Sequence, residues 1–160
     1  MNKGTLGSAQ ADIDAPPAVL YDLVSDVSRM GEWSPECRRC VWIDGATGPA
    51  VGARFKGSNR RGVFRWSTKP RVVVADPGRE FAFATTYLGS DMTKWTYRFE
   101  TGANGATVTE SFEMLRDMPW VFRVGDRLMG VTDRKADLEA GMQETLRRFK
   151  AAAETGTGSG

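Results

Sequence analysis

Two cysteines three residues apart, Cys37 and Cys40, are the first residues whose types and spacing suggest chemistry. Such a pair can belong to a zinc site or a redox centre. Structural zinc needs four ligands, however, and this chain has two cysteines and no histidine. A thioredoxin-type pair stands where a helix begins after a strand. Here the pair follows a turn at Ser34 and Pro35 and leads into the β-prone run 39–43.

On a regular strand the two cysteines point to opposite faces of the sheet. Their Cα atoms then lie about 10 Å apart, at about 3.3 Å per residue, whereas a disulfide requires less than about 7 Å. We therefore predict two unlinked, structural thiols. The absence of histidine also excludes Ser-His-Asp and Cys-His catalysis. The sequence thus predicts neither histidine-based nor metal-based catalysis, and no cofactor.

Glu110 is the most informative polar residue. It alternates with Val108 and Phe112, so strand parity places it on the apolar face. An isolated buried carboxylate is costly, so it must pair, accept hydrogen bonds or take up a proton. A raised pKa would suit a general acid or base, or a group that orients a ligand. The alternative is that a β-bulge turns Glu110 outward or that an arginine pairs with it. Tyr97 is a second candidate, as a phenol donor.

Alternation of apolar and polar residues predicts the strands that must position these side chains. Because most connections between them are short, neighbouring strands should be antiparallel, with one aromatic face and one polar face. The expected strands are residues 5–13, 38–43, 52–57, 63–74, 79–87, 93–101 and 106–114.

Helical periodicity occupies much of the remaining sequence. Residues 18–24 and 28–33 indicate two short helices, residues 115–134 an interrupted helical segment, and residues 135–153 a long amphipathic helix. This order is that of an α+β domain over residues 1–153, followed by a disordered tail over 154–160. A curled seven-stranded sheet is wider than one helix of about 10–12 Å diameter. Large side chains or a cavity must fill the remaining space.

Composition is that of one globular domain, with 160 residues, 41% hydrophobic and 26% charged. No run of about 18 apolar residues predicts a membrane span. Residues 1–12 lack the apolar core of a signal peptide, so we expect a cytoplasmic protein.

Four segments carry a resemblance to a known family: DIDAPPAVLYDLVSDVSRMGEWSPE, VGARFKGSNRRG, WTYRFETGANGATVTESFEM and GMQETLRRFKAAAE. They resemble the SRPBCC, or START-like, superfamily, and within it the actinobacterial polyketide cyclase/dehydrase-like proteins. The resemblance covers residues 5 to about 153 and implies the helix-grip fold. In that fold a seven-stranded curved antiparallel sheet wraps around a long C-terminal helix, with two short helices after the first strand. The superfamily includes lipid carriers, aromatase/cyclases and stress-response regulators, so the resemblance does not specify a function.

The favoured hypothesis is a START-like binding module that encloses a hydrophobic small molecule, such as a lipid, isoprenoid or polyketide, between sheet and C-terminal helix. Residues of the interrupted segment, including Met118, Leu128 and Met129, could gate this space. Any one of the inward aromatic residues could equally be plain core. The candidate ligand-binding residues are Trp66, Thr68, Phe81, Phe83, Tyr87, Trp95, Tyr97, Phe99, Glu110, Phe112, Trp120, Phe122, Leu138 and Met142.

Two alternative functions remain open. An aromatase/cyclase-like enzyme needs a shaped site that excludes water and one proton shuttle, for which Glu110 and Tyr97 are the candidate catalytic residues. An interaction protein would instead dock an anionic partner, an acyl-carrier protein or a membrane surface, on a basic strip without acids. The strip could also be a solvated face that protects sheet edges, and its aromatic residues have the wrong parity for nucleic acid. Its cations are Arg54, Lys56, Arg60, Arg61, Arg65, Lys69 and Arg71.

Overall fold

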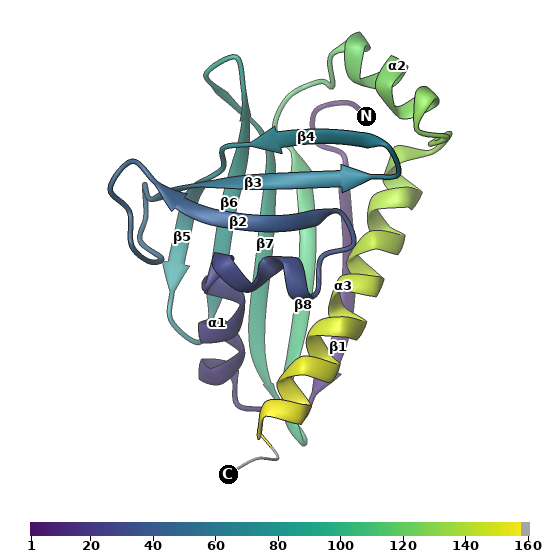
Figure 1. Cartoon of the computed structure of the whole chain (residues 1–160). Coiled ribbons are helices and arrows are strands. Elements are labelled where there is room, and N and C mark those ends of the chain that lie inside the picture. The colour runs from purple at the N-terminus through teal and green to yellow at the C-terminus, as the bar shows by residue number, and fades with distance from the viewer. Residues whose placement is uncertain (158–160) are drawn as a thin grey trace.

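The computed structural model describes residues 1–157, which form a curled antiparallel sheet closed by a long helix, α3 (Figure 1). The α+β helix-grip fold predicted from the sequence is confirmed. The elements are β1 (Leu6–Ile13), α1 (Pro17–Ser25), the 3-10 helix η1 (Val27–Glu32), β2 (Cys37–Ile43), β3 (Arg54–Arg61), β4 (Phe64–Thr68), β5 (Arg71–Asp76), β6 (Glu80–Tyr87), β7 (Ser90–Gly102), β8 (Gly105–Met114), α2 (Trp120–Leu128) and α3 (Arg134–Thr157).

The sheet follows the order β1-β8-β7-β6-β5-β3-β2, with β4 paired to β3 beside this path. The path has the seven strands expected, but the sheet has eight, because residues 63–74 do not form one strand. Pro70 interrupts them: proline lacks the N–H that a ladder requires. The segment before Pro70 pairs with β3 as a hairpin, and the segment after it becomes β5.

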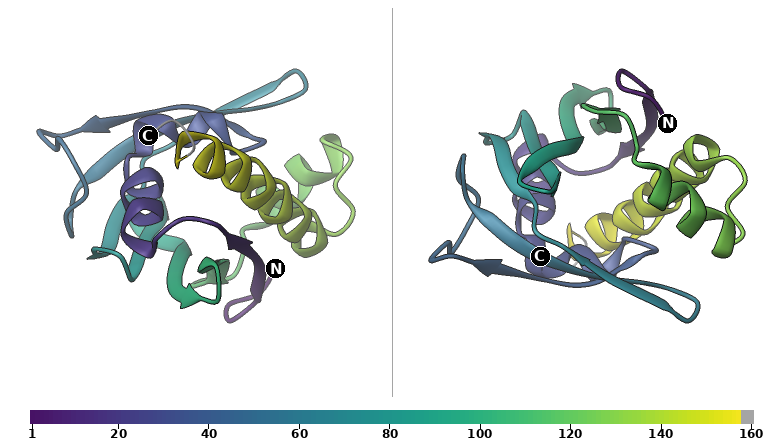
Figure 2. Two further views of the ribbon diagram at one scale, coloured as in Figure 1. Left: turned by 90° about the horizontal axis from the view of Figure 1, so that it is seen from below. Right: turned by 90° about the horizontal axis from the view of Figure 1, so that it is seen from above.

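The sheet curls so that its edge strands β1 and β2 lie on either side of α3 (Figure 2). On α3, Met142, Leu146 and Phe149 are buried. Trp33, directly after η1, packs against Phe149 with ring centroids 5.1 Å apart. The apolar stripe of α3 is thereby covered, while charged residues on the opposite face, such as Lys135, Arg147 and Lys150, stay in solvent.

Several boundaries differ from the predicted ones: β3 ends at Arg61 rather than at residue 57, and β7 begins at Ser90 rather than at residue 93. Residues 154–157, expected in a disordered tail, form the last turn of α3, and residues 158–160 lie outside the described residues. The interrupted segment 115–134 contains α2, which ends shortly before Gly130, a residue with φ of 77°. Glycine adopts this left-handed conformation at no steric cost, so the chain can turn there into α3. None of the helices within residues 1–157 has the length and apolar character needed to cross a bilayer.

Candidate functional site

Glu110 and Tyr97 meet on the inner face of the sheet, where β7 and β8 pair. The Tyr97 hydroxyl donates a hydrogen bond of 2.8 Å to Glu110 Oε1, and each residue is only 4% exposed. The second carboxyl oxygen, Oε2, has no hydrogen-bond partner within residues 1–157. No arginine of the described chain pairs with Glu110, so its carboxyl faces a largely apolar interior.

Burial raises the pKa of Glu110 to about 8, and the hydrogen bond from Tyr97 offsets only part of this effect. Burial and the adjacent Glu110 also raise the pKa of Tyr97. At neutral pH the Glu110 carboxyl is therefore mostly protonated. A neutral carboxyl both donates and accepts, so it can bind a hydroxyl or carbonyl group or exchange a proton with one.

Aromatic side chains surround this pair in cross-strand rows. Phe81 is the β6 partner of Tyr97, and the next row joins Phe83, Trp95 and Phe112 across three strands. The rings of Trp95 and Phe112 lie 5.7 Å apart. Cross-strand partners share one face of a sheet, so these rings form a continuous inner wall.

The inner face is closed near α1 and more open toward α2. Along β6, Phe81 is buried whereas Tyr87 is half-buried; along β7, Phe99 is buried whereas Trp95 is half-buried. The Tyr87 ring contacts Phe122 of α2, with centroids 5.0 Å apart, so α2 lies beside the open end. A molecule reaching the inner face would therefore approach it from the side on which α2 lies.

The other predicted ligand-binding residues lie in three places. Trp66 and Thr68 of β4 share the inner face with their β3 partners. Leu138 is half-buried and Met142 is buried on α3. Trp120 of α2 is 75% exposed and does not belong to the closed interior.

Cys37 and Cys40 are both buried, and their Sγ atoms lie 3.2 Å apart. The predicted orientation to opposite faces is wrong because a β-bulge shifts the register between Cys37 and Arg39. The extra residue turns both thiols inward. Both cysteines are free, as expected. Their mutual hydrogen bond lowers the pKa of the Cys37 thiol and raises that of the Cys40 thiol.

We expect both thiols to be lost together when the protein is incubated with oxidised glutathione. Both thiols are buried, so the exchange takes place when this part of the chain opens locally. The Cys37 thiolate then attacks the glutathione disulfide and releases one glutathione, and Cys40 displaces the second, leaving a Cys37–Cys40 disulfide. Thiol titration after denaturation should fall from two per chain to none, without cross-linked dimers. Cys40→Ser should instead keep glutathione attached to Cys37. Two persistent thiols, or disulfide-linked dimers, would contradict this expectation.

Residues 33–36, Trp-Ser-Pro-Glu, connect η1 to β2 and tie this connection to α3. Trp33 packs on Phe149, and Ser34 Oγ accepts a 3.0 Å hydrogen bond from the Cys37 backbone N–H. Glu36 forms an ion pair with Arg61. The sequence alone suggested no role for this segment, because Phe149 and Arg61 are far away in the chain.

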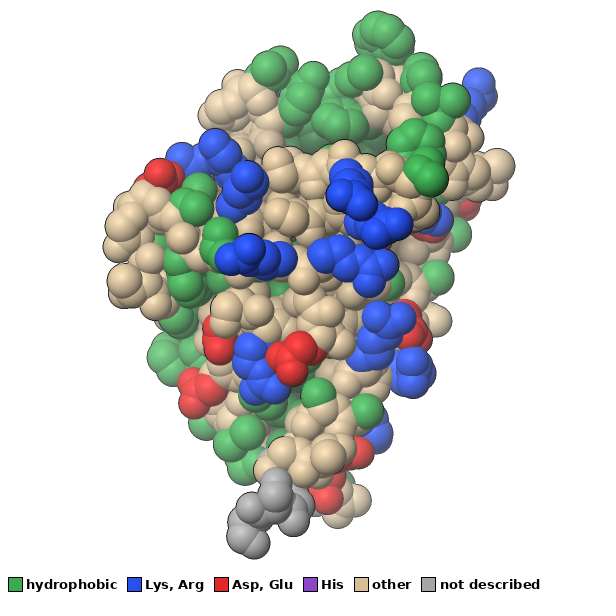
Figure 3. Space-filling model, viewed as in Figure 1, with side chains coloured by type: hydrophobic (Ala, Val, Ile, Leu, Met, Phe, Trp, Pro, Cys, Tyr) green, Lys and Arg blue, Asp and Glu red, His purple; other side chains and the backbone are tan. Residues whose placement is uncertain are grey.

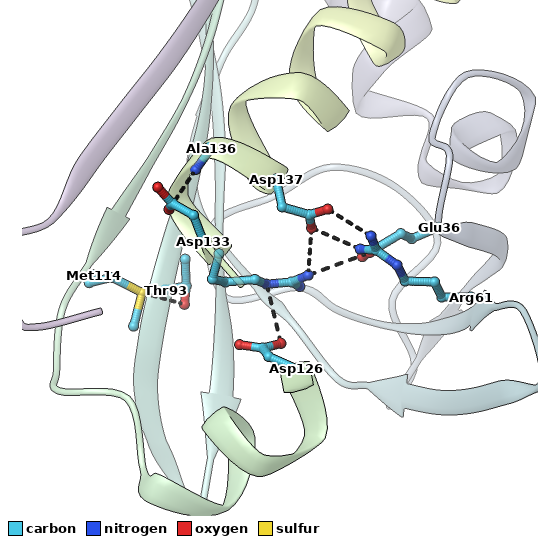
Figure 4. A network of polar contacts seen from close by, with 9 residues as sticks. Glu36, Arg61, Thr93, Met114, Asp126, Asp133, Ala136 and Asp137 are labelled. Atoms are coloured by element: carbon cyan, nitrogen blue, oxygen red, sulfur yellow. Dashed lines mark hydrogen bonds and ion pairs between the residues drawn. The ribbon is translucent and has the colours of Figure 1, made fainter. Parts of the chain in front are cut away.

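An ion-pair network joins β3, α2 and α3 (Figure 4). Arg61 makes two contacts with Asp137, of 2.7 and 2.8 Å, and one with Glu36 of 3.2 Å. Arg134 contacts Asp137 at 2.9 Å and approaches Asp126 of α2 at 3.8 Å. The hydrogen bond from Arg61 lowers the pKa of Asp137, so this carboxylate stays ionised and holds the start of α3 to the sheet.

Three of the seven cations predicted to dock an anionic partner are already paired. Arg54 contacts Asp44 at 3.0 Å, Arg71 contacts Asp91 at 2.6 Å, and Arg61 belongs to the network just described. They are therefore poor candidates for an external anion. The cations of the strip that form no ion pair within residues 1–157 are Lys56, Arg60, Arg65 and Lys69.

The model of a family described as polyketide cyclase / dehydrase and lipid transport matches residues 7–154. The polyketide_cyc-like protein Cgl2372 from Corynebacterium glutamicum is 35% identical, over 98% of this chain and 86% of that one, with a TM-score of 0.52. No curated protein matches the chain.

Two more distant structures share the fold. The di-domain ARO/CYC StfQ from the steffimycin biosynthetic pathway is 16% identical with a TM-score of 0.73, over 96% of this chain and 51% of that one. The major latex-like protein 151 from Panax ginseng is 15% identical with a TM-score of 0.69, over 93% and 97% of the two chains.

Proposed function

Because the chain belongs to the polyketide cyclase / dehydrase and lipid transport family, we propose that it binds a hydrophobic small molecule between its sheet and α3. The observation that carries this proposal is Glu110 Oε2, a buried polar atom without a partner within residues 1–157. Leaving such an atom unpaired costs about 1–3 kcal/mol. A hydroxyl or carbonyl group of the ligand would remove that cost.

The apolar part of the ligand would lie between Glu110 and the opening of the inner face beside α2. Trp95, Tyr87 and Trp66 are half-buried there, so a ligand can displace water from their rings. Each Å² of apolar surface removed from water contributes about 25 cal/mol. Met142 on α3 suits an irregular apolar ligand, because its unbranched side chain adapts to different shapes. This geometry favours a lipid, isoprenoid or polyketide-like molecule with a polar group at its inner end.

The orientation by Glu110 can be tested with decanol and decane as matched ligands. The native protein should bind decanol about tenfold more tightly, because only the alcohol forms a hydrogen bond with the carboxyl. Glu110→Leu should abolish this preference. Glu113→Leu is the matched control, since Glu113 lies on the same strand but is exposed.

Competition for an apolar fluorescent dye measures both affinities, and mass spectrometry of organic extracts would identify any molecule purified with the protein. Failure of the protein to bind decane, decanol or the dye would overturn the proposed function. An unchanged preference for decanol over decane in Glu110→Leu would show that Glu110 does not contact the ligand.

A second candidate function, cyclase-like catalysis, is favoured by the direct contact between Tyr97 and Glu110. A carboxyl with a pKa of about 8 can donate or accept a proton near neutral pH during cyclisation of a poly-β-keto chain. Glu110→Gln retains the shape but removes the titrating proton, so it should abolish turnover of a poly-β-keto thioester and spare binding. Glu113→Gln should change neither. Full turnover in Glu110→Gln would dismiss the catalytic role.

A further inference from the structure

Helix α2 exposes its apolar side chains and buries its only carboxylate. Trp120 and Leu128 are 75% and 69% exposed, and Val121 and Val124 are also exposed, whereas Asp126 is buried beside Arg134. A helix of a globular protein normally turns its apolar stripe toward the core. The outward stripe of α2 has no cover within residues 1–157.

Two strand turns present further apolar tips at the same end. Val63, in the β3–β4 turn, is 86% exposed, and Leu88, in the β6–β7 turn, is 87% exposed. The contact between Tyr87 and Phe122 joins the β6–β7 turn to α2. The β3–β4 turn is held near α2 because Arg61, at the end of β3, belongs to the same ion-pair network as Asp126. Hydrophobic side chains accordingly gather over this end in Figure 3. We call these tips and the apolar stripe of α2 the α2 end.

Cations without ion-pair partners in the described chain lie beside two of the three parts of the α2 end, the helix itself and the β3–β4 turn. Arg123 and Arg127 are exposed on α2 itself. Arg60 and Arg65 face each other across the β3–β4 hairpin, in the second pair behind the turn that carries Val63. Figure 3 shows basic side chains on the sheet face next to the apolar end. The surface is therefore apolar at its tips and carries positive charge beside α2 and the β3–β4 turn.

We propose that the α2 end docks on the surface of a bilayer that contains anionic lipids. Exposed Trp and Leu side chains with flanking arginines are the features of a helix that lies in the membrane interface. The cations would be attracted by the negative surface potential of such a bilayer. The apolar tips project from three separate segments. A fluid bilayer can receive them independently, whereas a protein partner would need a matching pocket for each.

Docking in this orientation would place the open end of the inner face against the membrane. Trp95 and Tyr87 are half-buried near that opening, and α2 lies beside it. The bilayer docking does not depend on the identity of a bound small molecule, and its test uses none. Failure of the vesicle assay and failure of the ligand assay are therefore separate results.

The first test is sedimentation of the full chain with vesicles of phosphatidylcholine, with and without phosphatidylglycerol. We expect binding to the anionic vesicles that weakens in about 0.5 M salt, where charge interactions are screened within about 3–8 Å. The double variant Trp120→Ser/Leu128→Ser should reduce the partition coefficient at least about tenfold. The control Val19→Ser/Val51→Ser also removes two exposed apolar side chains, but from α1 and the β2–β3 connection, and should bind like the native protein.

The second test separates charge from apolar insertion. Arg123→Gln/Arg127→Gln should weaken binding to anionic vesicles about tenfold and leave the weak binding to neutral vesicles unchanged. Arg79→Gln alters an exposed cation in the β5–β6 turn, which packs on α1 at the other end of the molecule, and should have no effect. All substituted residues in these variants are exposed, and circular dichroism verifies their fold. Absence of vesicle binding, or equal binding by Trp120→Ser/Leu128→Ser and the native protein, would overturn the proposal.

Discussion

The free energy of unfolding of the native protein should fall by about 5 kcal/mol as the pH rises from about 4.5 to about 8, and Glu110→Gln should abolish this fall. The pKa of Glu110 is about 8 in the folded chain, against an ordinary value of 4.5. Between these values the folded chain keeps a proton that the unfolded chain has released. The free energy of unfolding therefore falls by about 1.4 kcal/mol per pH unit. The contribution is complete below about pH 4.5 and lost above about pH 8.

Denaturant unfolding at several pH values measures this effect as the difference between variant and native protein. Subtracting the two curves cancels the titration of the other groups, because glutamine does not ionise. Glu113→Gln, an exposed change on the same strand, should retain the native pH dependence. Parallel curves for Glu110→Gln and the native protein would mean that the carboxyl is ionised in the fold. This result would also contradict the proposed ligand contact, which depends on a neutral carboxyl as hydrogen-bond donor.

Trp33→Ala should cost about 3–5 kcal/mol of the free energy of unfolding, as is usual for truncation of a buried tryptophan. Trp33 is 1% exposed, and its ring is 5.1 Å from that of Phe149 at an edge-to-face angle of 68°. The Arg29 guanidinium lies 5.6 Å from the centre of the same ring. Truncation would therefore leave a cavity between η1 and α3 and remove the aromatic contact that joins them.

Trp120→Ala is the matched control for this substitution. It removes the same atoms from a mostly exposed position, so its effect should stay within about 0.5 kcal/mol. Thermal or denaturant unfolding monitored by far-UV circular dichroism measures both changes. Similar stability of the two variants would show that the contact between Trp33 and Phe149 does not hold η1 to α3.

The inner face of the sheet could be predicted from the sequence because strand alternation is local. β8 runs without a bulge from Gly105 to Met114, so parity alone places Glu110 on the same face as Val108 and Phe112. The same holds for Trp95 and Tyr97 of β7. The two-residue period of an extended backbone requires no knowledge of the partner strand.

Parity failed where a strand is irregular. The bulge after Cys37 brings two thiols together that a regular strand would separate. Pro70 divides a run of residues that alternates like one strand into two strands. In both cases the pairing with β3 decides which residues face inward, and local alternation does not predict that pairing.

The sequence by itself thus determined the α+β order of elements, the aromatic face of the sheet and the inward carboxyl of Glu110. Only the tertiary structure decided which charges are neutralised and which apolar residues stay exposed. Arg61 pairs with Asp137, 76 positions away, and Trp33 contacts Phe149 because η1 packs on α3. Alternation follows from the backbone of each residue alone, whereas these contacts depend on how the sheet curls and where the helices pack against it.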